Sequence, residues 1–211
     1  MIAVVDYGVG NLRSAQKGLE RAAAEEGLDL EVRVTPEPAD IERARGVVLP
    51  GVGAFAHCME ELAEAGMTDV VLDAAASGRP FFGICVGMQI LFEESEEFGR
   101  VRGLGVLPGR VTRFRSRSVK IPHMGWNALE KRTPTAMFDG IPDGTYYYFV
   151  HSFYAQPTDT AVVAATSTYG DEEFAAAVGR GNVFATQFHP EKSQEAGIRL
   201  LRNFVRTVGA A

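Results

Sequence analysis

The stretch Arg79-Pro-Phe-Phe-Gly-Ile-Cys-Val-Gly-Met-Gln-Ile-Leu-Phe92 decides the fold of this chain. Within it an apolar run ends at Gly83-Ile-Cys-Val-Gly87, and an amphipathic run follows at once. This pattern is typical of a nucleophile elbow, a sharp turn between a strand and a helix that exposes its central residue, here Cys85. Glycine on both sides lets strand and helix come close, and the positive end of the helix favours the reactive thiolate. The alternative, a buried structural cysteine, does not require the two glycines.

Length and composition indicate one globular unit. The chain has 211 residues, of which 46% are hydrophobic, so we expect a single domain over residues 1–211 with a large core. A net charge of −6 disfavours nucleic acid as a partner. Only two cysteines occur, which excludes a disulfide scaffold and indicates a reducing compartment. The start Met1-Ile-Ala-Val-Val-Asp6 lacks a signal-peptide pattern and no apolar run reaches about 18 residues, so we expect a cytoplasmic protein that does not enter membranes.

The first half of the chain alternates short apolar runs with helical periodicity. Strands are predicted at residues 1–6, 30–34, 46–49 and 81–84. Helices are predicted at residues 11–26, 56–76 and 87–94. This order predicts a parallel sheet with helices on both faces, in which ligands bind beyond the carboxyl ends of the strands.

The second half has a different pattern. Further strands are predicted at residues 106–114, 146–154, 161–167, 174–178 and 183–188. Gly179-Arg-Gly-Asn182 predicts a hairpin turn, and residues 193–208 predict a closing helix. We therefore predict an α/β fold of three layers, with a mostly parallel central sheet that antiparallel strands extend in the second half.

A cysteine nucleophile needs a base, and the base needs an orienting group. The segment His189-Pro-Glu191 directly follows an apolar run. Pro190 favours extended backbone at His189, and residues two apart in an extended chain point the same way. The sequence therefore predicts Cys85, His189 and Glu191 as nucleophile, base and orienter. The remaining histidines have weaker claims: His57, His123 and His151.

The loop Pro50-Gly-Val-Gly53 follows another predicted strand. Its glycines allow the backbone to approach a ligand, so its N–H groups could stabilise the oxyanion that forms when sulfur attacks an amide. An ordinary strand-to-helix turn is the alternative. Gly8-Val-Gly10 is only a fragment of a phosphate-binding pattern, and the dinucleotide fingerprint is absent. No cluster has the spacing of metal ligands, so we expect neither a metal nor a cofactor.

Six segments together resemble a known family. Class I (triad) glutamine amidotransferases share three of them: Pro50-Gly-Val-Gly-Ala-Phe55, Gly83-Ile-Cys-Val-Gly-Met-Gln89 and His189-Pro-Glu-Lys-Ser193. Three others resemble the glutaminase subunits of imidazole glycerol phosphate synthase: Asp6-Tyr-Gly-Val-Gly-Asn-Leu-Arg-Ser14, Pro122-His-Met-Gly-Trp-Asn127 and Tyr146-Tyr-Tyr-Phe-Val-His-Ser152. The resemblance runs from about residue 3 to about residue 207 and implies a flavodoxin-like form of the fold.

The resemblance also implies a reaction. Cys85 would attack the side-chain amide of L-glutamine, and water would then release glutamate from the thioester. The ammonia would pass to a (β/α)8-barrel cyclase subunit in a heterodimer, which forms imidazole glycerol phosphate and an aminoimidazole carboxamide ribotide in histidine biosynthesis. The residues implied for glutamine and its oxyanion are Gly51, Val52, Gly53, Gln89, Ser152 and Phe153. Those implied to face the cyclase are Asn11, Trp126, Tyr148 and Lys192.

Other interpretations remain open from the residues alone. One is a triad glutaminase that serves anthranilate or vitamin B6 synthesis, which the segments at residues 6–14 and 146–152 fit poorly. A second is an idle regulatory protein of the same fold, and a third is a cysteine peptidase or stress protein. In the third class a histidine often follows the cysteine closely, whereas Val86 follows here. We further expect the loop at residues 50–53 to need a partner protein to adopt its active conformation.

Overall fold

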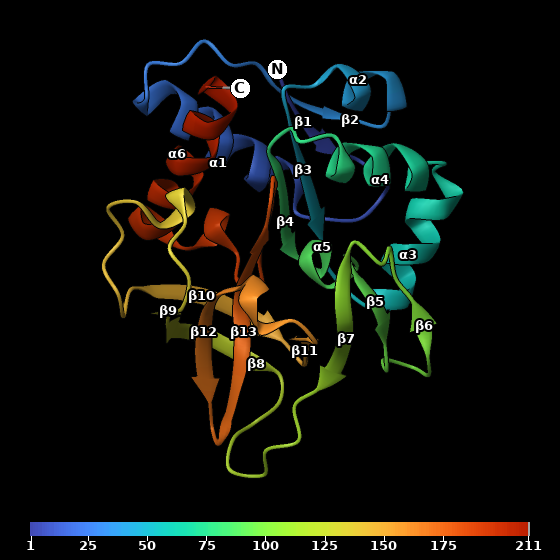
Figure 1. Cartoon of the computed structure of the whole chain (residues 1–211), viewed down its shortest axis with the longest axis vertical. Coiled ribbons are helices and arrows are strands. Elements are labelled where there is room, and N and C mark those ends of the chain that lie inside the picture. The colour runs from blue at the N-terminus through green and yellow to red at the C-terminus, as the bar shows by residue number, and fades with distance from the viewer. Residues whose placement is uncertain (211) are drawn as a thin grey trace.

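The computed structural model describes residues 1–210 (Figure 1). Within these residues, eight strands form the main sheet, in the order β2-β1-β3-β4-β14-β13-β12-β9. Their bounds are β2 (Val32–Thr35), β1 (Ile2–Val5), β3 (Gly46–Gly51), β4 (Phe81–Cys85), β14 (Val183–Thr186), β13 (Glu172–Arg180), β12 (Val163–Tyr169) and β9 (Glu130–Lys131). The strands from β2 to β14 are parallel, and the other three are added antiparallel. This arrangement confirms the predicted fold class, and the parallel part has the flavodoxin-like order 2-1-3-4-5.

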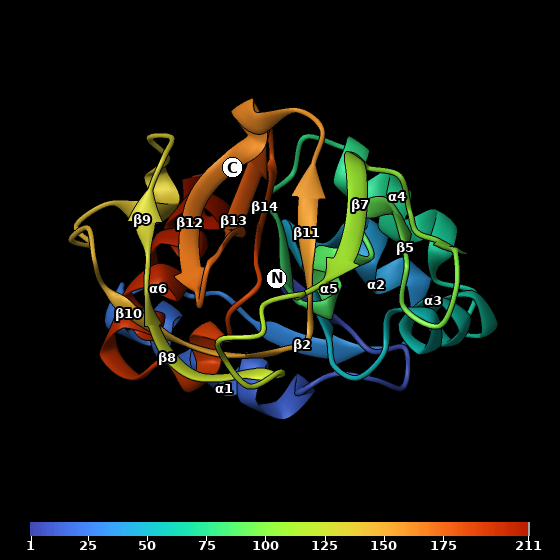
Figure 2. The same cartoon turned by 90° about the horizontal axis from the view of Figure 1, so that it is seen from below.

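Helices cover both faces of this sheet (Figures 1 and 2). On one side lie α1 (Leu12–Glu25) and α6 (Gln194–Ala210). On the other lie α2 (Pro38–Arg43), α3 (Phe55–Glu64) and α4 (Thr68–Ala76). Every residue of β1, β3, β4 and β14 is buried, as expected for parallel strands covered on both faces.

Two helix predictions in the first half need correction. The helix predicted at residues 56–76 is two helices, because Gly66 adopts a left-handed φ of 68° and ends the first. The helix predicted at residues 87–94 is too long. Only Val86–Gln89 is helical (α5), and the chain then enters the strand β5 (Phe92–Ser95). In this strand Phe92 and Ser95 are buried, while Glu93 is exposed. The apolar residues that suggested one long helix therefore belong to a helical turn and the strand that follows it.

Several strands of the second half leave the main sheet. A four-stranded sheet in the described chain has the order β11-β7-β5-β6, formed by β11 (Phe153–Pro157), β7 (Leu107–Arg113), β5 and β6 (Val101–Arg102). A separate two-stranded ribbon pairs β8 (His123–Ala128) with β10 (Tyr146–His151). The strand predicted at residues 146–154 is therefore two strands that separate at Ser152 and join different partners. The prediction that these strands extend the main sheet was wrong for β7, β10 and β11.

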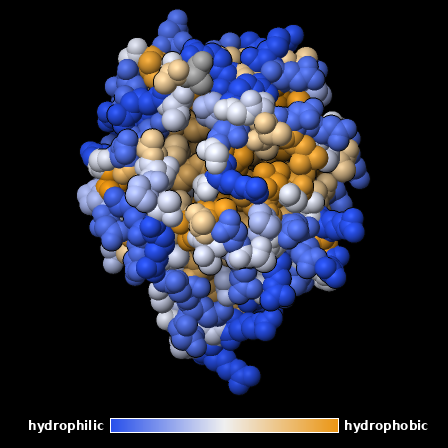
Figure 3. Space-filling view, viewed as in Figure 1, coloured by the Kyte–Doolittle hydropathy of each residue, from blue (hydrophilic) through white to orange (hydrophobic). Residues whose placement is uncertain are grey.

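Other predictions for this half hold. β13 and β14 form the predicted hairpin, in which Arg180 is opposite Val183 and Gly181 has a φ of 59°. Short 3-10 helices complete the described chain: η1 (Ala136–Phe138), η2 (Thr160–Val162) and η3 (Pro190–Lys192). Hydrophilic side chains cover the lower tip of the molecule, and hydrophobic ones gather right of the centre (Figure 3). Among residues 1–210, no helix combines the length and the hydropathy needed to cross a membrane.

Candidate active site

Cys85 lies at the strained turn that the flanking glycines predict. It ends β4 with φ 57° and ψ −112°, a region that residues other than glycine rarely adopt. A Cβ at Gly87 would lie 1.9 Å from Leu49 O, and one at Gly51 would lie 2.6 Å from Gly87 N. Any side chain at either position would therefore separate β3 from the elbow. The helix after Cys85 is a single turn, so its dipole stabilises a thiolate at Cys85 less than a longer helix would.

His189 and Glu191 meet as predicted, although by a different local geometry. Glu191 Oε1 lies 2.8 Å from His189 Nδ1, and both side chains are 2% exposed. His189 is extended, but Glu191 lies in the 3-10 turn η3, so the carboxylate reaches the ring through a turn and not along a strand. Cys85 lies near enough to the same imidazole to raise its pKa. Glu191 Oε2 is buried and has no hydrogen-bond partner among the described residues.

The backbone of the His189 turn is tied to strand β10. The N–H of His189 donates to Tyr148 O at 3.0 Å. The N–H of Tyr148 donates to Ser193 Oγ at 3.0 Å, and the Ser193 hydroxyl donates to His189 O at 2.6 Å. These bonds close a ring around the fully buried Ser193, so the position of the imidazole depends on the ribbon strand beside it.

The environment of His189 favours its protonated form. Burial alone lowers the pKa of this imidazole, but the charge and hydrogen bond of Cys85, together with Glu191, outweigh burial and raise the pKa from 6.5 to about 10. A protonated His189 can donate a proton to a leaving nitrogen. A neutral one can accept a proton from a thiol or from water.

A cavity of about 370 Å³ opens beside Cys85 and gathers most of the predicted residues. Predicted residues in its lining are Val52, Gly53, Cys85, Gln89, Ser152, Phe153, His189 and Lys192. Gly51 is adjacent, since it is paired with Cys85 between β3 and β4. The predicted nucleophile, base and glutamine-binding positions therefore surround one small hollow at the carboxyl ends of the parallel strands.

Gln89 links the cavity wall to a residue that sequence reasoning missed. Its Nε2 donates to Phe153 O and to Gln187 Oε1, each at 2.9 Å. The fully buried Gln187 then turns its own Nε2 toward Cys85 Sγ at 3.7 Å. Gln187 stands two residues before His189, so its place beside the histidine was a signal that could have identified it.

Two further unpredicted residues hold the loop at residues 50–53. The Tyr7 hydroxyl donates to Pro50 O at 2.8 Å, and the Cys58 thiol donates to Val52 O at 3.3 Å. Burial raises the pKa of Cys58 to about 11, so this cysteine remains a neutral thiol. Gly53 is exposed with a φ of 87°, which leaves the end of the loop open to a ligand or a partner.

Of the four residues expected at a partner interface, Lys192 lines this cavity and the other three do not. Trp126 and Tyr148 face each other across the ribbon, with ring centroids 6.2 Å apart. Asn11 Nδ2 donates to Glu191 Oε1 at 3.4 Å, and Lys192 lines the cavity itself. Each of the four positions is thus connected to the His189 turn. Lys192 and Asn11 belong to it or contact it, Tyr148 accepts a hydrogen bond from it, and Trp126 is paired with Tyr148.

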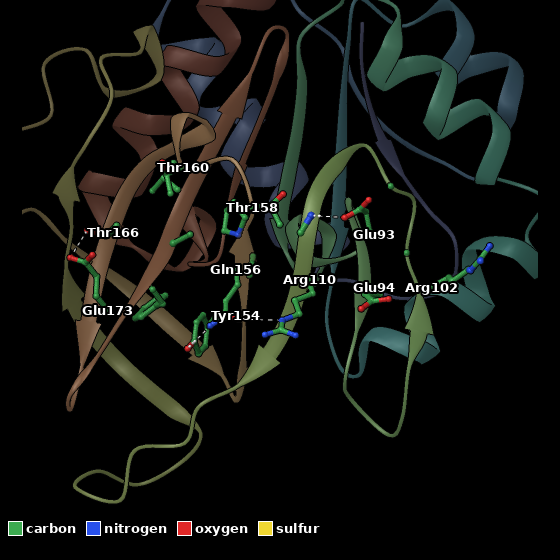
Figure 4. A pocket seen from close by; sticks show the side chains of 18 of the residues that line it. Glu93, Glu94, Arg102, Arg110, Tyr154, Gln156, Thr158, Thr160, Thr166 and Glu173 are labelled. Carbon is green, nitrogen blue, oxygen red and sulfur yellow. Dashed lines mark hydrogen bonds between the residues drawn. The ribbon is translucent and has the colours of Figure 1, made fainter.

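A larger hollow, of about 1230 Å³, lies elsewhere between β7, β11, β12 and β13 (Figure 4). Charged and polar side chains line it, among them Glu93, Arg102, Arg110 and Glu173. It contains none of the predicted site residues. Size therefore does not identify the reactive site, because the smaller cavity holds the only strained cysteine and its imidazole within the described chain.

The family follows from comparison with known proteins. A family model described as glutamine amidotransferase class-I matches residues 4–208, so the chain belongs to the class-I glutamine amidotransferases. It is 51% identical over 210 residues to the imidazole glycerol phosphate synthase subunit HisH of Syntrophotalea carbinolica, covering 97% of this chain and 98% of that protein. The subunit HisH of Geobacter metallireducens is 52% identical over 210 residues, covering 96% of each chain. Within its class, the chain belongs with these HisH subunits, which confirms the family resemblance of the sequence.

Solved structures agree with the fold. A crystal structure of a glutamine amidotransferase superimposes with a TM-score of 0.73 at 23% identity, covering 99% of this chain and 100% of that one. The glutaminase domain of CTPS from Trypanosoma brucei, with bound acivicin, has a TM-score of 0.68 at 16% identity, covering 99% and 93%. At these identities the likeness concerns the fold alone.

Proposed function

We propose that the protein hydrolyses L-glutamine to glutamate and ammonia on Cys85. The sulfur attacks the side-chain carbonyl carbon, and N–H groups of the loop at residues 51–53 stabilise the oxyanion. His189 donates a proton to the departing nitrogen, which leaves as ammonia and a thioester. Water then attacks the thioester, His189 accepts its proton, and glutamate leaves as the C–S bond breaks. Glu191 orients the imidazole throughout.

The observation that carries this proposal is the meeting of three elements at one small cavity. The elbow holds Cys85, η3 holds the His189–Glu191 pair, and Gln89 with the start of β11 forms the facing wall. The one side-chain oxygen of Gln89, Oε1, receives no hydrogen bond within residues 1–210, so Gln89 retains an acceptor for the amino or amide group of a substrate.

We further propose that the ammonia passes to a (β/α)8-barrel cyclase, which uses it to form imidazole glycerol phosphate. Ammonia reacts as a nucleophile only when neutral, and a sheltered passage keeps it from protonation and dilution in bulk water. The HisH relatives are subunits of a synthase by name, which supports a partner of this kind. The ribbon β8–β10 suits its docking, because its outer face exposes Met124 (63%), Trp126 (46%) and Tyr146 (58%).

We place this activity in a single domain over residues 1–211 that works in the cytoplasm without metal or cofactor. The support is chemical: both cysteines are free, which suits a reducing compartment, and the proposed steps need only side chains, backbone N–H groups and water.

The test is an assay of the complex with its cyclase and acceptor. Cys85→Ala should abolish glutamine-dependent synthesis and leave ammonia-dependent synthesis unchanged, because free ammonia bypasses the sulfur chemistry. Loss of both activities would mean that Cys85 is structural. Glutaminase turnover measured with and without the cyclase tests the expected dependence of the loop on a partner, and equal rates would contradict it.

A further inference from the structure

Two buried histidines that the proposed chemistry does not use lie side by side in the ribbon β8–β10, and one of them reaches the cavity beside Cys85. His123 on β8 and His151 on β10 are opposite each other in the ribbon, and His123 Nδ1 lies 3.1 Å from His151 Nε2. They are 3% and 7% exposed. His151 also lines the cavity beside Cys85.

Their hydrogen bonds fix which ring nitrogens carry protons. Phe153 O accepts only, so His151 Nδ1, 2.9 Å away, must carry a hydrogen. Burial lowers the pKa of His151 to about 3 and that of His123 to about 4, so both rings are neutral near pH 7. His151 Nε2 therefore accepts from His123 Nδ1–H. The remaining acceptor, His123 Nε2, faces Asn127 Nδ2 at 3.4 Å.

The bonds form one directed chain toward the cavity wall. It runs from Asn127 through His123 and His151 to the carbonyl of Phe153, where the first residue of β11 leaves the ribbon. The same carbonyl accepts from Gln89 Nε2. Phe153 O is thus held from two sides, by the ribbon and by the elbow helix.

Aromatic side chains also pack against both rings. His123 is stacked between Tyr169, with centroids 4.0 Å apart, and Phe149, with centroids 4.9 Å apart. Phe174 packs on His151 with centroids 5.1 Å apart. A ring clamped in this way can fix the position of a backbone carbonyl with little freedom left.

We propose that His123 and His151 are a positioning pair that holds the Phe153 carbonyl, and with it the Ser152–Phe153 wall, in place to bind glutamine. The inference rests on the proposed function, since it assigns a role in glutamine binding at that site. It also ties glutamine binding to the ribbon, because the outer face of the same two strands carries Trp126 and Tyr148.

The test is a comparison of KM with kcat in the complex with the cyclase. His151→Phe keeps a ring in the aromatic cluster but removes both hydrogen bonds, and it should raise KM for glutamine about tenfold while kcat changes less than about threefold. His151→Asn places an amide N–H near the former Nδ1, so it should restore a KM close to that of the wild type. Phe174→Leu removes ring packing and keeps the hydrogen bonds, so it should leave KM unchanged.

Each outcome decides a separate point. An unchanged KM in His151→Phe would overturn the inference, and so would an equal rise of KM in Phe174→Leu, because packing alone would then explain it. Cooperative unfolding of each variant in urea reports that all three fold. Absence of glutamine turnover in the wild-type complex would overturn the proposed function itself, whereas wild-type turnover with an unchanged KM in His151→Phe would overturn only the positioning role.

Discussion

At the residue scale, the two cysteines differ in what surrounds them. Cys85 has a strained backbone, an imidazole partner and a cavity beside it. Cys58 is fully buried on α3, and its thiol donates to a backbone carbonyl. We therefore propose that the same side chain is reactive at one position, whereas at the other it is a structural hydrogen-bond donor.

This difference predicts selective alkylation. A glutamine-analogue alkylator should modify the native protein once, at Cys85, when the cyclase and acceptor are present. Cys58 should react only after unfolding in urea, because burial raises its pKa to about 11 and blocks access. Peptide mass spectrometry locates the label, and Cys85→Ala should remain unlabelled under native conditions. Labelling of native Cys58 would contradict the assignment.

The charge state of His189 is a second prediction at this scale. Burial lowers the pKa of His189, while Cys85 and Glu191 raise it to about 10, so the ring should titrate above pH 8 in the wild type. Cys85→Ala removes the largest raising contribution and leaves the burial, so the pKa should fall by more than about one unit. Ring NMR signals followed against pH measure both values. An unchanged pKa in Cys85→Ala would show that Cys85 does not interact with the imidazole.

At the scale of elements, features set by adjacent residues could be predicted and features set by distant partners could not. The elbow, the hairpin at residues 179–182 and the contact of His189 with Glu191 each depend on a few consecutive residues. The division of residues 146–154 into β10 and β11 depends on β8 and β7, which are distant in sequence. The contacts of Gln187 with Cys85 and of His151 with His123 were not predicted for the same reason, because these partners are 102 and 28 residues apart in the sequence.

Substitution of Ser193 tests whether the hydrogen bonds that connect β10 with the His189 turn contribute to activity. Ser193→Ala leaves the N–H of Tyr148 unpaired and loosens the His189 turn, so glutamine-dependent kcat should fall about tenfold, and stability should fall by about 1–3 kcal/mol. Ser167→Ala is the matched control. Ser167 is also buried and donates to a backbone carbonyl, Ala128 O, but on β12. It should lose comparable stability in urea and keep its kcat. Equal kcat in the two variants would mean that the hydrogen bonds of Ser193 do not contribute to catalysis.

At the scale of the whole molecule, the ribbon β8–β10 connects the surface to the reactive site. Its outer face is exposed and apolar, while its inner face buries His123, Tyr147, Phe149 and His151. Its backbone also binds the His189 turn, and its end becomes the cavity wall. A partner that docks on the ribbon would therefore contact an element that touches both the His189 turn and the wall of the cavity beside Cys85, which suits the proposed transfer of ammonia to a second site.

The same buried pair makes the stability of the whole chain depend on acid pH. In the unfolded chain each imidazole binds a proton below about pH 6.5, whereas in the folded chain His123 and His151 stay neutral until about pH 4 and 3. Stability rises with pH wherever the unfolded state binds more protons, so this contribution is complete above pH 6.5 and is lost as pH falls toward 4. For each of the two imidazoles, the free energy of unfolding should fall by about 2 kcal/mol between pH 7.5 and pH 5.

Urea unfolding at these two pH values measures that loss. His151→Phe removes one titrating ring, so the difference in unfolding free energy between pH 7.5 and pH 5 should shrink by about 2 kcal/mol relative to the wild type. Phe174→Leu should lower stability equally at both pH values and leave the difference intact. His189 acts in the opposite direction, because it stays protonated in the folded chain while the unfolded imidazole releases its proton above about pH 6.5. This contribution is present in the wild type and in both variants, so it cancels when they are compared. A difference of the same size in His151→Phe and in the wild type would mean that His151 is not held neutral by the fold.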